Sequence, residues 1–338
     1  MLGMIIILIF SAFILTKEEK LKFEIPKGWP KPNYDLKTNP LTQEGFELGR
    51  ELFYDPILSS DSSISCSSCH LSYTSFAHTD HRLSHGINGL IGTRNSPALI
   101  NLAWNTSFMW DGGVNNLESQ PINPITSKIE MNSSLTDVVK KLNASAKYRK
   151  LFFTAFKDSV VNTQKLFRAM ALFTGNLISC NSKYDSVMRK EKNVQFTSAE
   201  AKGYILFKKN CSSCHTEPLF TNGLFENNGL GMDTALKDLG RMRITSLSKD
   251  SLKFKVPTLR NIEFSFPYMH DGRFKRLSEV LKHYTTGVQK SKTLSPILDK
   301  PIVLTSDERV DLMAFLLTLS DKAFIYNANY AFPKNNNK

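Results

Sequence analysis

The sequence lacks long hydrophobic runs, long basic runs and abundant cysteine. Its one strongly apolar stretch, residues 2–15, is shorter than the roughly 20 residues of a spanning helix, which excludes a polytopic membrane protein. The 43 Lys and Arg exceed the 31 Asp and Glu, for a formal charge of +12, but they are scattered and form no nucleic-acid-binding motif. We therefore expect a generally basic, solvated surface and no nucleic-acid partner.

Of the 338 residues, 41% are apolar, which suffices for packed cores. At about 100–200 residues per domain, this length predicts two domains. Charged residues follow the apolar stretch from Lys17 onward, as in a secretory signal. No Lys or Arg precedes that stretch and no cleavage site is clear. Residues 1–20 are therefore interpreted as an export signal or, less favoured, an uncleaved N-terminal anchor, and we expect a periplasmic protein.

Four of the five cysteines form two C-x-x-C pairs, and a histidine follows each pair directly. The residues are Cys66, Cys69 and His70, and then Cys211, Cys214 and His215. C-x-x-C-H is the attachment pattern of a c-type haem, because the two thiols form thioethers with the porphyrin and the adjacent imidazole reaches the iron. The sequence therefore predicts two covalently bound c-type haems, with His70 and His215 as iron ligands.

Other uses of these cysteines fit less well. The two pairs begin 145 residues apart (211 − 66), whereas the pairs of a zinc site are separated by about 15–20 residues. A thioredoxin-like pair would lie near a βαβ pattern, and two structural disulfides would not explain the two histidines. The fifth cysteine, Cys180, falls within residues 164–184, which we expect to be helical, and it receives no role.

A loose internal repeat supports two haem modules. The motif G-x-x-L-F begins at Gly49 before the first pair and at Gly203 before the second. Two further motifs recur in the same order: Arg94-Asn95 before Trp110-Asp111-Gly112, and Arg260-Asn261 before His270-Asp271-Gly272. We infer that each half of the chain surrounds one haem.

Apolar residues at helical spacing predict helices at 42–54, 135–142, 145–156, 163–178, 198–209, 277–284 and 306–319. Long loops rich in Gly, Asn, Ser and Pro separate them and would wrap the haems. The expected fold is mainly α, with two cytochrome-c-like haem domains and long irregular loops. We place the N-terminal domain at 30–190 and the C-terminal domain at 195–325.

On these motifs the chain resembles the bacterial di-haem cytochrome c peroxidase and MauG family. The likeness runs from residue 39 to residue 319 and includes, beside the haem motifs, Arg94-Asn95-Ser96-Pro97, Pro257-Thr258-Leu259-Arg260-Asn261 and Pro267-Tyr268-Met269-His270-Asp271-Gly272. The resemblance implies that His70 binds the iron of a peroxidatic haem and His215 that of an electron-transfer haem. It also implies reduction of hydrogen peroxide to water.

The resemblance implies roles for further residues. Trp110 would relay electrons between the haems, and Gln120 and Glu130, ten and twenty residues later, would occupy the distal pocket. A carboxylate beside the iron can move the proton that peroxide cleavage requires. The interdomain calcium ion of the family would be bound by Asn95 and by backbone carbonyls near Ser265 and Pro267.

One departure from the family concerns the peroxidatic iron. The peroxidases that need reductive activation carry a histidine that blocks this iron until reduction removes it. At the corresponding place this chain has Ile87, and His78, His81 and His85 of the same loop are alternatives for that ligand. We expect a peroxidatic iron that is open in the fully ferric state.

A second departure concerns the sixth ligand of the other haem. Fourteen residues after His270, where the activated peroxidases carry methionine, this chain has Tyr284, as MauG-like members do. Met269 and His283 are less favoured alternatives by register. A phenolate ligand stabilises ferric iron, whereas a thioether raises the reduction potential.

Three functions compete on this sequence. The preferred one is a peroxidase that takes electrons from a small cytochrome c or cupredoxin. The second is a MauG-like oxidase that acts on a protein substrate, and the third is a non-enzymatic di-haem electron carrier. Gln120 and Glu130 disfavour the carrier, which has no use for a distal acid. A homodimer is expected from the resemblance alone.

Overall fold

The computed structural model describes residues 21–333, so the predicted export signal or anchor over residues 1–20 lies outside the described residues. Within 21–333 no helix has the length and apolar character needed to cross a bilayer. The one sheet in this part of the chain pairs β1 (Phe225–Glu226) with β2 (Phe254–Lys255) in antiparallel register. The prediction of a mainly α protein is confirmed.

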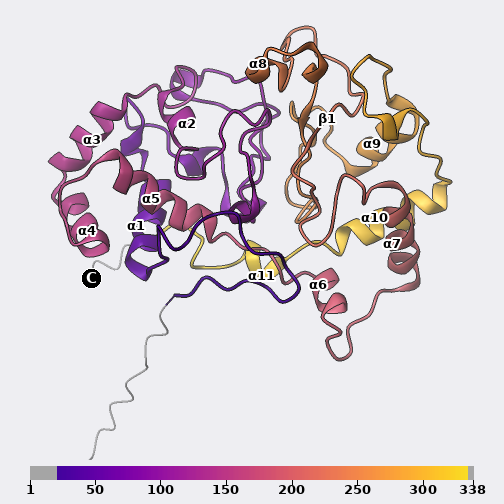
Figure 1. Cartoon of the computed structure of the whole chain (residues 1–338), viewed down its shortest axis with the longest axis horizontal. Helices are drawn as coiled ribbons and strands as arrows, with labels where there is room; N and C mark the ends of the chain where they lie inside the picture. Colours follow the sequence, from indigo (N-terminus) through magenta and orange to yellow (C-terminus); the bar gives the residue numbers. More distant parts are fainter. Residues whose placement is uncertain (1–20, 334–338) are drawn as a thin grey trace, which may run out of the picture.

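The helices form two lobes (Figure 1). The first lobe is built on α1 (Gln43–Tyr54) and α5 (Thr163–Gly175), which pack together, with α2 (Ile122–Thr126), α3 (Leu135–Ala144) and α4 (Ala146–Phe156). The second lobe is built on α7 (Ser198–Asn210) and α10 (Ser306–Leu317), with α8 (Met242–Thr245) and α9 (Leu277–Lys282). The short α6 (Lys183–Met188) connects α5 to α7, and α11 (Lys322–Ile325) follows α10.

Side-chain caps explain where the main helices begin. Thr42, Thr197 and Thr305 precede α1, α7 and α10, and each hydroxyl accepts a hydrogen bond from the backbone N–H three residues later. In α7 and α10 that later residue is Glu200 or Glu308, whose carboxylate accepts in return from the threonine N–H. Each helix predicted from apolar spacing is present, with ends that differ by a few residues.

The helix predicted for residues 164–184 is wrong beyond Gly175, where α5 ends, and Cys180 lies in an irregular segment. The Asn101 side chain accepts from the Ser179 N–H at 2.9 Å and donates to the Ser179 carbonyl at 3.2 Å. Because a side chain binds both backbone groups of Ser179, neither is left for a helical hydrogen bond. Apolar spacing alone does not reveal this long-range competition.

The two recurring glycines are explained by helix crossings. A Cβ atom on Gly49 would lie 2.0 Å from the Ala169 carbonyl oxygen of α5, and a Cβ atom on Gly203 would lie 1.9 Å from the Asp311 carbonyl oxygen of α10. Each glycine therefore lets its helix approach the partner's backbone more closely than any side chain would allow. The shared packing confirms the repeat predicted from these glycines.

A second repeat consists of two tight hairpins, one around Trp110 and one around His270. Asn101 and Asn261 lie nine residues before these two side chains, and both have the left-handed φ of 56°. Asn95 lies fifteen residues before Trp110 and does not share this conformation. The predicted pairing of the two Arg-Asn motifs is therefore wrong, because Asn261 is the counterpart of Asn101.

The chain returns to the first lobe near its end. Phe315 of α10 belongs to the hydrophobic core of the second lobe, whereas Phe324 of α11 packs in the core of the first lobe, 6.1 Å from Phe76 between ring centroids. The yellow segment in Figure 1 shows this return. The predicted domain ranges, 30–190 and 195–325, stay predictions.

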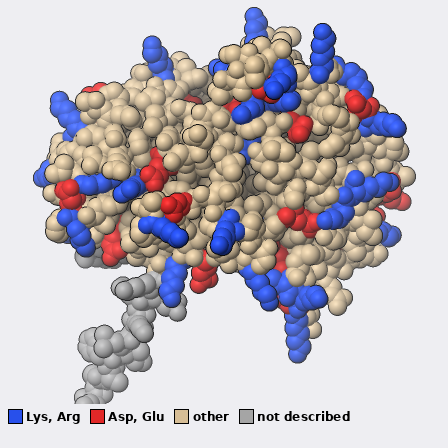
Figure 2. Space-filling model, in the orientation of Figure 1, with Lys and Arg blue, Asp and Glu red and all other residues tan. Residues whose placement is uncertain are grey.

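Charged side chains are mixed over the visible surface. Figure 2 shows Lys and Arg spread across both lobes, with Asp and Glu among them, rather than gathered into one basic patch. This face fits the generally basic, solvated surface expected from the net charge of +12.

Candidate functional site

The first haem motif forms one tight turn. The N–H groups of Cys69 and His70 both donate to the Cys66 carbonyl, at 3.2 and 3.0 Å, so both thiols and the imidazole project from the same turn. Nδ1 of His70 lies 2.7 Å from the Phe76 carbonyl oxygen, and an Nδ1–H that donates there leaves Nε2 with the lone pair that iron ligation requires. Burial lowers the pKa of His70 to about 4, which keeps the ring neutral.

The second haem motif repeats this geometry. The N–H groups of Cys214 and His215 donate to the Cys211 carbonyl at 3.2 and 2.9 Å. Nδ1 of His215 lies 3.2 Å from the Phe220 carbonyl oxygen and 3.1 Å from that of Pro257, so Nε2 is again left for a metal. Burial lowers the pKa of His215 as well.

Both motifs line one continuous cavity of about 650 Å³. All five cysteines of the described chain are free thiols, so neither C-x-x-C pair is closed by a disulfide. Paired thiols, a neutral imidazole with its second nitrogen anchored, and a cavity in front of them are what covalent haem attachment requires. The residues present therefore fit two c-type haems.

Glu130 and Gln120 lie on the wall of the same cavity. Glu130 is close enough to the first motif for its charge to act on the Cys66 thiol. Burial raises the pKa of this thiol to about 12, and the neighbouring Cys69 and Glu130 charges add to that rise. Burial also raises the pKa of the Glu130 carboxyl. The Gln120 amide Nε2 lies 3.8 Å from the Met109 sulfur, in the hairpin around Trp110. The structure thus brings both predicted distal residues to the haem cavity.

Trp110 is held between the lobes through Asn95. Nε1 of Trp110 donates to the Asn95 carbonyl at 2.8 Å, and the Asn95 N–H donates to the His270 carbonyl at 2.8 Å. The carbonyl of Trp110 in turn accepts from the Lys255 N–H at 2.7 Å. Asn95 therefore joins the hairpin around Trp110 to the equivalent hairpin around His270. The Trp110 indole lies in the wall of the cavity that both haem motifs share.

Tyr284 faces the second motif. It lies in a π-helical segment, His283–Gly287, that continues α9, and such segments are frequent at functional sites. Burial raises the pKa of its phenol, and the nearby thiols of Cys211 and Cys214 add to this rise while a hydrogen bond from Asn228 opposes it. The Asn228 amide nitrogen lies 3.3 Å from the Tyr284 hydroxyl.

The two alternative ligands of the second haem differ in their surroundings. The Met269 sulfur lies 3.5 Å from the same Asn228 amide nitrogen and also lines the cavity. The His283 Nε2 lies 3.0 Å from the Asn228 carbonyl oxygen, so this ring is already bound to the backbone. Tyr284 and Met269 are thus the two candidates that face the cavity.

The loop before Arg94 is fixed against Glu130. The Ile87 N–H donates to the Glu130 carbonyl at 2.8 Å, and a Cβ atom on Gly86 would lie 1.9 Å from the Ile129 carbonyl oxygen. The Ile87 side chain is buried and contains no atom that can bind iron. Of the predicted alternatives in this loop, His85 lines the cavity.

The predicted calcium ligands lie at the junction of the lobes. Asn95, Ser265 and Pro267 all line the shared cavity. The Asn95 amide nitrogen donates to the Arg82 carbonyl at 3.1 Å, which leaves its side-chain oxygen as the group available to a cation. Calcium binding stays a prediction.

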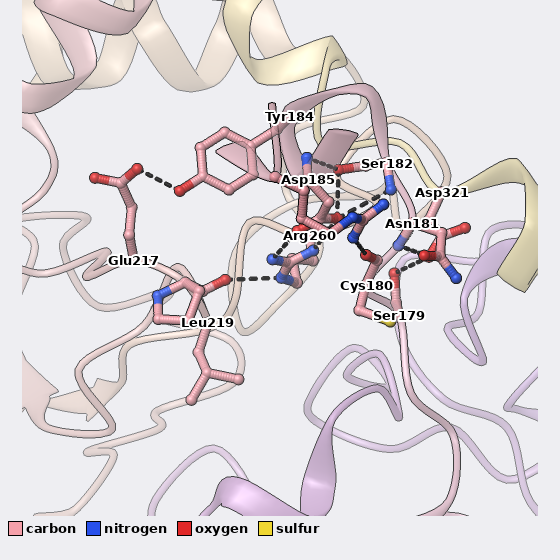
Figure 3. A network of polar contacts seen from close by, with 12 residues as sticks. Ser179, Cys180, Asn181, Ser182, Tyr184, Asp185, Glu217, Leu219, Arg260 and Asp321 are labelled. Atoms are coloured by element: carbon pink, nitrogen blue, oxygen red, sulfur yellow. Dashed lines mark hydrogen bonds and ion pairs between the residues drawn. The ribbon is translucent and has the colours of Figure 1, made fainter. Parts of the chain in front are cut away.

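A buried ion pair beneath the second motif escaped the sequence analysis. Figure 3 shows Arg260 and Asp185 face to face, joined by two hydrogen bonds of 2.8 and 2.9 Å. Arg260 also donates to the Pro218 carbonyl at 2.8 Å, three residues after His215. The arginine thereby ties the haem loop to the segment before α6. Its position in the Arg260-Asn261 motif was a signal, but its burial depends on a partner 75 residues away.

A second missed group is Lys255, which lines the cavity beside Trp110. Its ammonium donates to the Ser107 carbonyl at 2.9 Å, and burial lowers its pKa to about 8. The ion pairs of Arg94 were also missed: its guanidinium pairs with Asp111 at 2.6 Å and, across the lobes, with Asp238 at 2.6 Å. Arg94 and Lys255 both line the shared cavity, where they would supply positive charge for the carboxylates of bound haems.

Comparison with known proteins places this arrangement among di-haem enzymes. Residues 43–193 match the family model described as di-haem cytochrome c peroxidase. The chain is 37% identical over 312 residues to methylamine utilization protein MauG of Methylorubrum extorquens, covering 89% of this chain and 84% of that protein. It is 33% identical over 296 residues to cytochrome c551 peroxidase of Nitrosomonas europaea, covering 86% and 84%. The solved structure of a MauG-like protein associated with microbial copper homeostasis matches with a TM-score of 0.83 at 31% identity, covering 93% of this chain and 99% of that one.

Proposed function

Because the chain belongs to the di-haem cytochrome c peroxidase and MauG family, we propose that it reduces hydrogen peroxide to water with electrons from a small periplasmic cytochrome c or cupredoxin. The family implies two c-type haems, and the cysteines and histidines described above fit them. The reaction consumes one hydrogen peroxide, two electrons and two protons and yields two molecules of water. The protein must therefore both deliver protons and conduct electrons.

The observation that carries this proposal is the Glu130 carboxyl in the cavity of the first haem motif. The first haem, when bound, supplies the iron at which hydrogen peroxide is reduced. Glu130 takes a proton from one peroxide oxygen and returns it to the other through its carboxylate, as a general base and then a general acid. Burial, which raises its pKa, favours a carboxyl that can hold the proton between these steps. The Gln120 amide orients peroxide by donating a hydrogen bond.

Trp110 serves in this proposal as the electron relay between the two haem sites. Its indole N–H is fixed on the Asn95 carbonyl, and Asn95 is itself bound to His270 of the second lobe. An oxidisable ring at this junction shortens each step that an electron must make between the lobes. Asn95, Ser265 and Pro267 would bind the calcium ion that holds the junction together.

A direct test follows the stoichiometry of the reaction. We expect the as-isolated diferric protein, mixed with hydrogen peroxide, to change its absorption spectrum without prior reduction, because Ile87 offers no ligand to the peroxidatic iron. With a reduced small cytochrome c or cupredoxin present, two equivalents of donor should be oxidised for each peroxide. Stopped-flow absorption measures both quantities. Absence of peroxide-dependent donor oxidation would reject the peroxidase, and a spectrum that changes only after one-electron reduction would show that another group blocks the iron.

A second candidate function is a MauG-like oxidation of a protein substrate. The observation that favours it is Tyr284, which faces the thiols of Cys211 and Cys214 where a MauG-like sixth ligand is expected. The similarity to proteins named MauG is as extensive as that to the peroxidases. Peroxide-dependent modification of a partner protein, without turnover of small electron donors, would select this function.

The assignment of Tyr284 can be tested by spectroscopy. We expect Tyr284→Phe to change the ferric absorption and electron paramagnetic resonance spectra of the second haem, because the hydroxyl that would bind its iron is lost. Tyr326→Phe is the matched control, since the Tyr326 side chain is 73% exposed and lies outside the cavity. Identical spectra for wild type and Tyr284→Phe would remove Tyr284 from the iron and leave Met269 as the candidate.

A further inference from the structure

Three imidazoles outside the proposed catalytic machinery converge in the loop between His70 and Arg94. One ring nitrogen from each of His78, His81 and His85 lies within 4.8 Å of the other two. Among residues 21–333 no other group of three His, Cys, Asp or Glu side chains shows this convergence. Apart from the alternative that one of these histidines blocks the peroxidatic iron, the family roles assigned above do not use the cluster.

The spacing of the cluster fits metal ligation better than hydrogen bonding. Nδ1 of His81 and Nε2 of His78 lie 3.4 Å apart, longer than an ordinary hydrogen bond. Two nitrogens bound to a tetrahedral zinc ion at 2.0–2.1 Å lie about 3.3 Å apart. The rings of His81 and His85 approach to 4.2 Å between centroids. The nitrogen separation between His78 and His81 is therefore close to the one that a shared cation would impose.

Two ring nitrogens of this cluster are unsatisfied. Nδ1 of His78 and Nδ1 of His85 are buried and have no hydrogen-bond partner. A buried polar atom without a partner is costly, and a bound ion is one recognised explanation for it. Because His78 faces His81 through Nε2, the unpartnered atom that bears on a shared ion is Nδ1 of His85.

The backbone around the cluster is already fixed. The Asn95 amide donates to the Arg82 carbonyl at 3.1 Å, and the Arg82 guanidinium pairs with Asp233 at 2.7 Å and Asp271 at 3.2 Å in the second lobe. At the other end, the Ile87 N–H donates to the Glu130 carbonyl at 2.8 Å. The backbone that carries the three rings is thus held between Glu130 and the junction of the lobes.

We propose that His78, His81 and His85 bind one borderline first-row transition-metal ion, Zn²⁺ or Cu²⁺, through three imidazole nitrogens. Imidazole suits both ions, and three protein ligands leave a fourth position for water. His81 is exposed while His78 is buried, so the ion enters from solvent at His81. A bound ion holds the His85 ring in the cluster, so this site and a role of His85 as a haem ligand exclude each other.

The test uses the full-length protein with both haems in place. After treatment with a chelator, the protein is dialysed against a series of buffered Zn²⁺ concentrations, and zinc and iron are measured by mass spectrometry. We expect one zinc for every two irons. Loss of even an outer partner of a metal ligand lowers affinity by about 10–100-fold, so His81→Ala should weaken zinc binding at least about tenfold. His81→Cys, which supplies a thiolate, should restore binding.

Leu90→Ala is the matched control, because Leu90 is an exposed side chain of the same loop without a ligand atom. It should bind zinc as the wild type does. His81 is exposed, so His81→Ala should keep both haems and its unfolding temperature, which absorption and circular dichroism check. Equal zinc content in wild type and His81→Ala would overturn the proposal. So would a ferric haem spectrum that loses a nitrogen ligand in His85→Ala, since that result would place His85 on the iron.

Discussion

Replacement of Glu130 by glutamine should lower the rate of hydrogen peroxide reduction by about 100- to 10,000-fold, the usual contribution of a positioned general acid–base group. Glutamine keeps the size and polarity of the side chain but cannot take up the proton. The loss should therefore appear in the rate constant for the reaction with peroxide, measured by stopped-flow absorption. The haem content and the spectrum before peroxide is added should be those of the wild type.

The matched control is Glu44→Gln, an exposed glutamate in the first turn of α1. It carries the same chemical change outside the cavity and should leave the rate constant unaltered. A Glu130→Gln protein that reacts with peroxide as fast as this control would show that another group moves the proton. The proposed role of Glu130 in moving the proton would then be rejected, independently of which residue binds the iron of the second haem.

Replacement of Asp185 by alanine should lower the free energy of unfolding by about 3–5 kcal/mol, because it leaves the charge of Arg260 buried and unpaired. Arg260 is 0% exposed, and its only carboxylate partner among the described ion pairs is Asp185. Guanidinium denaturation of the di-haem protein, followed by circular dichroism, measures the change. Asp299→Ala removes an exposed pair with Lys290 instead and should cost about 0–1 kcal/mol.

The same substitution should change the response to acid. Burial alone would raise the pKa of Asp185, but the hydrogen bonds and charge of Arg260 outweigh it and lower the pKa below the ordinary value of 3.8. A carboxyl with a depressed pKa stabilises the fold above its unfolded pKa, and this contribution is lost as the pH falls through the folded pKa. Wild-type stability should therefore decline more steeply than that of Asp185→Ala below pH 3.8. If the stabilities of wild type and Asp185→Ala fell in parallel below pH 3.8, the ion pair between Asp185 and Arg260 would be contradicted.

The sequence predicted features that depend on neighbouring residues. The spacing of Cys66, Cys69 and His70 defines a haem turn because thiols and imidazole must leave one turn of backbone. Thr42 and Thr197 mark helix starts because a hydroxyl caps the N–H groups three residues later. Gly49 was recognised as part of a repeat, although its reason, contact with a carbonyl of α5, required the packed helices.

Features that depend on distant partners were not predictable in this way. Asn101 ends the helical hydrogen bonding near Ser179, yet nothing close to either residue in sequence indicates their contact. The three loop histidines were noted as neighbours of Ile87, but their convergence was not predicted, and Arg82 of the same loop is anchored by acids of the second lobe. In each case a side chain acts on backbone or charge more than ten residues away.

The return of the chain to the first lobe has a mechanical consequence. Only a few residues separate Phe315 and Leu319 in one hydrophobic core from Phe324 in the other. Ser179 forms a second connection between the two lobes. Its N–H donates to the Asn101 side chain, and its hydroxyl accepts from the Asn261 side chain. Neither lobe can move away or unfold alone without disrupting the hydrophobic core of the other lobe. The protein should unfold as one cooperative unit, and the two haem motifs should keep a fixed separation rather than move with two tethered domains.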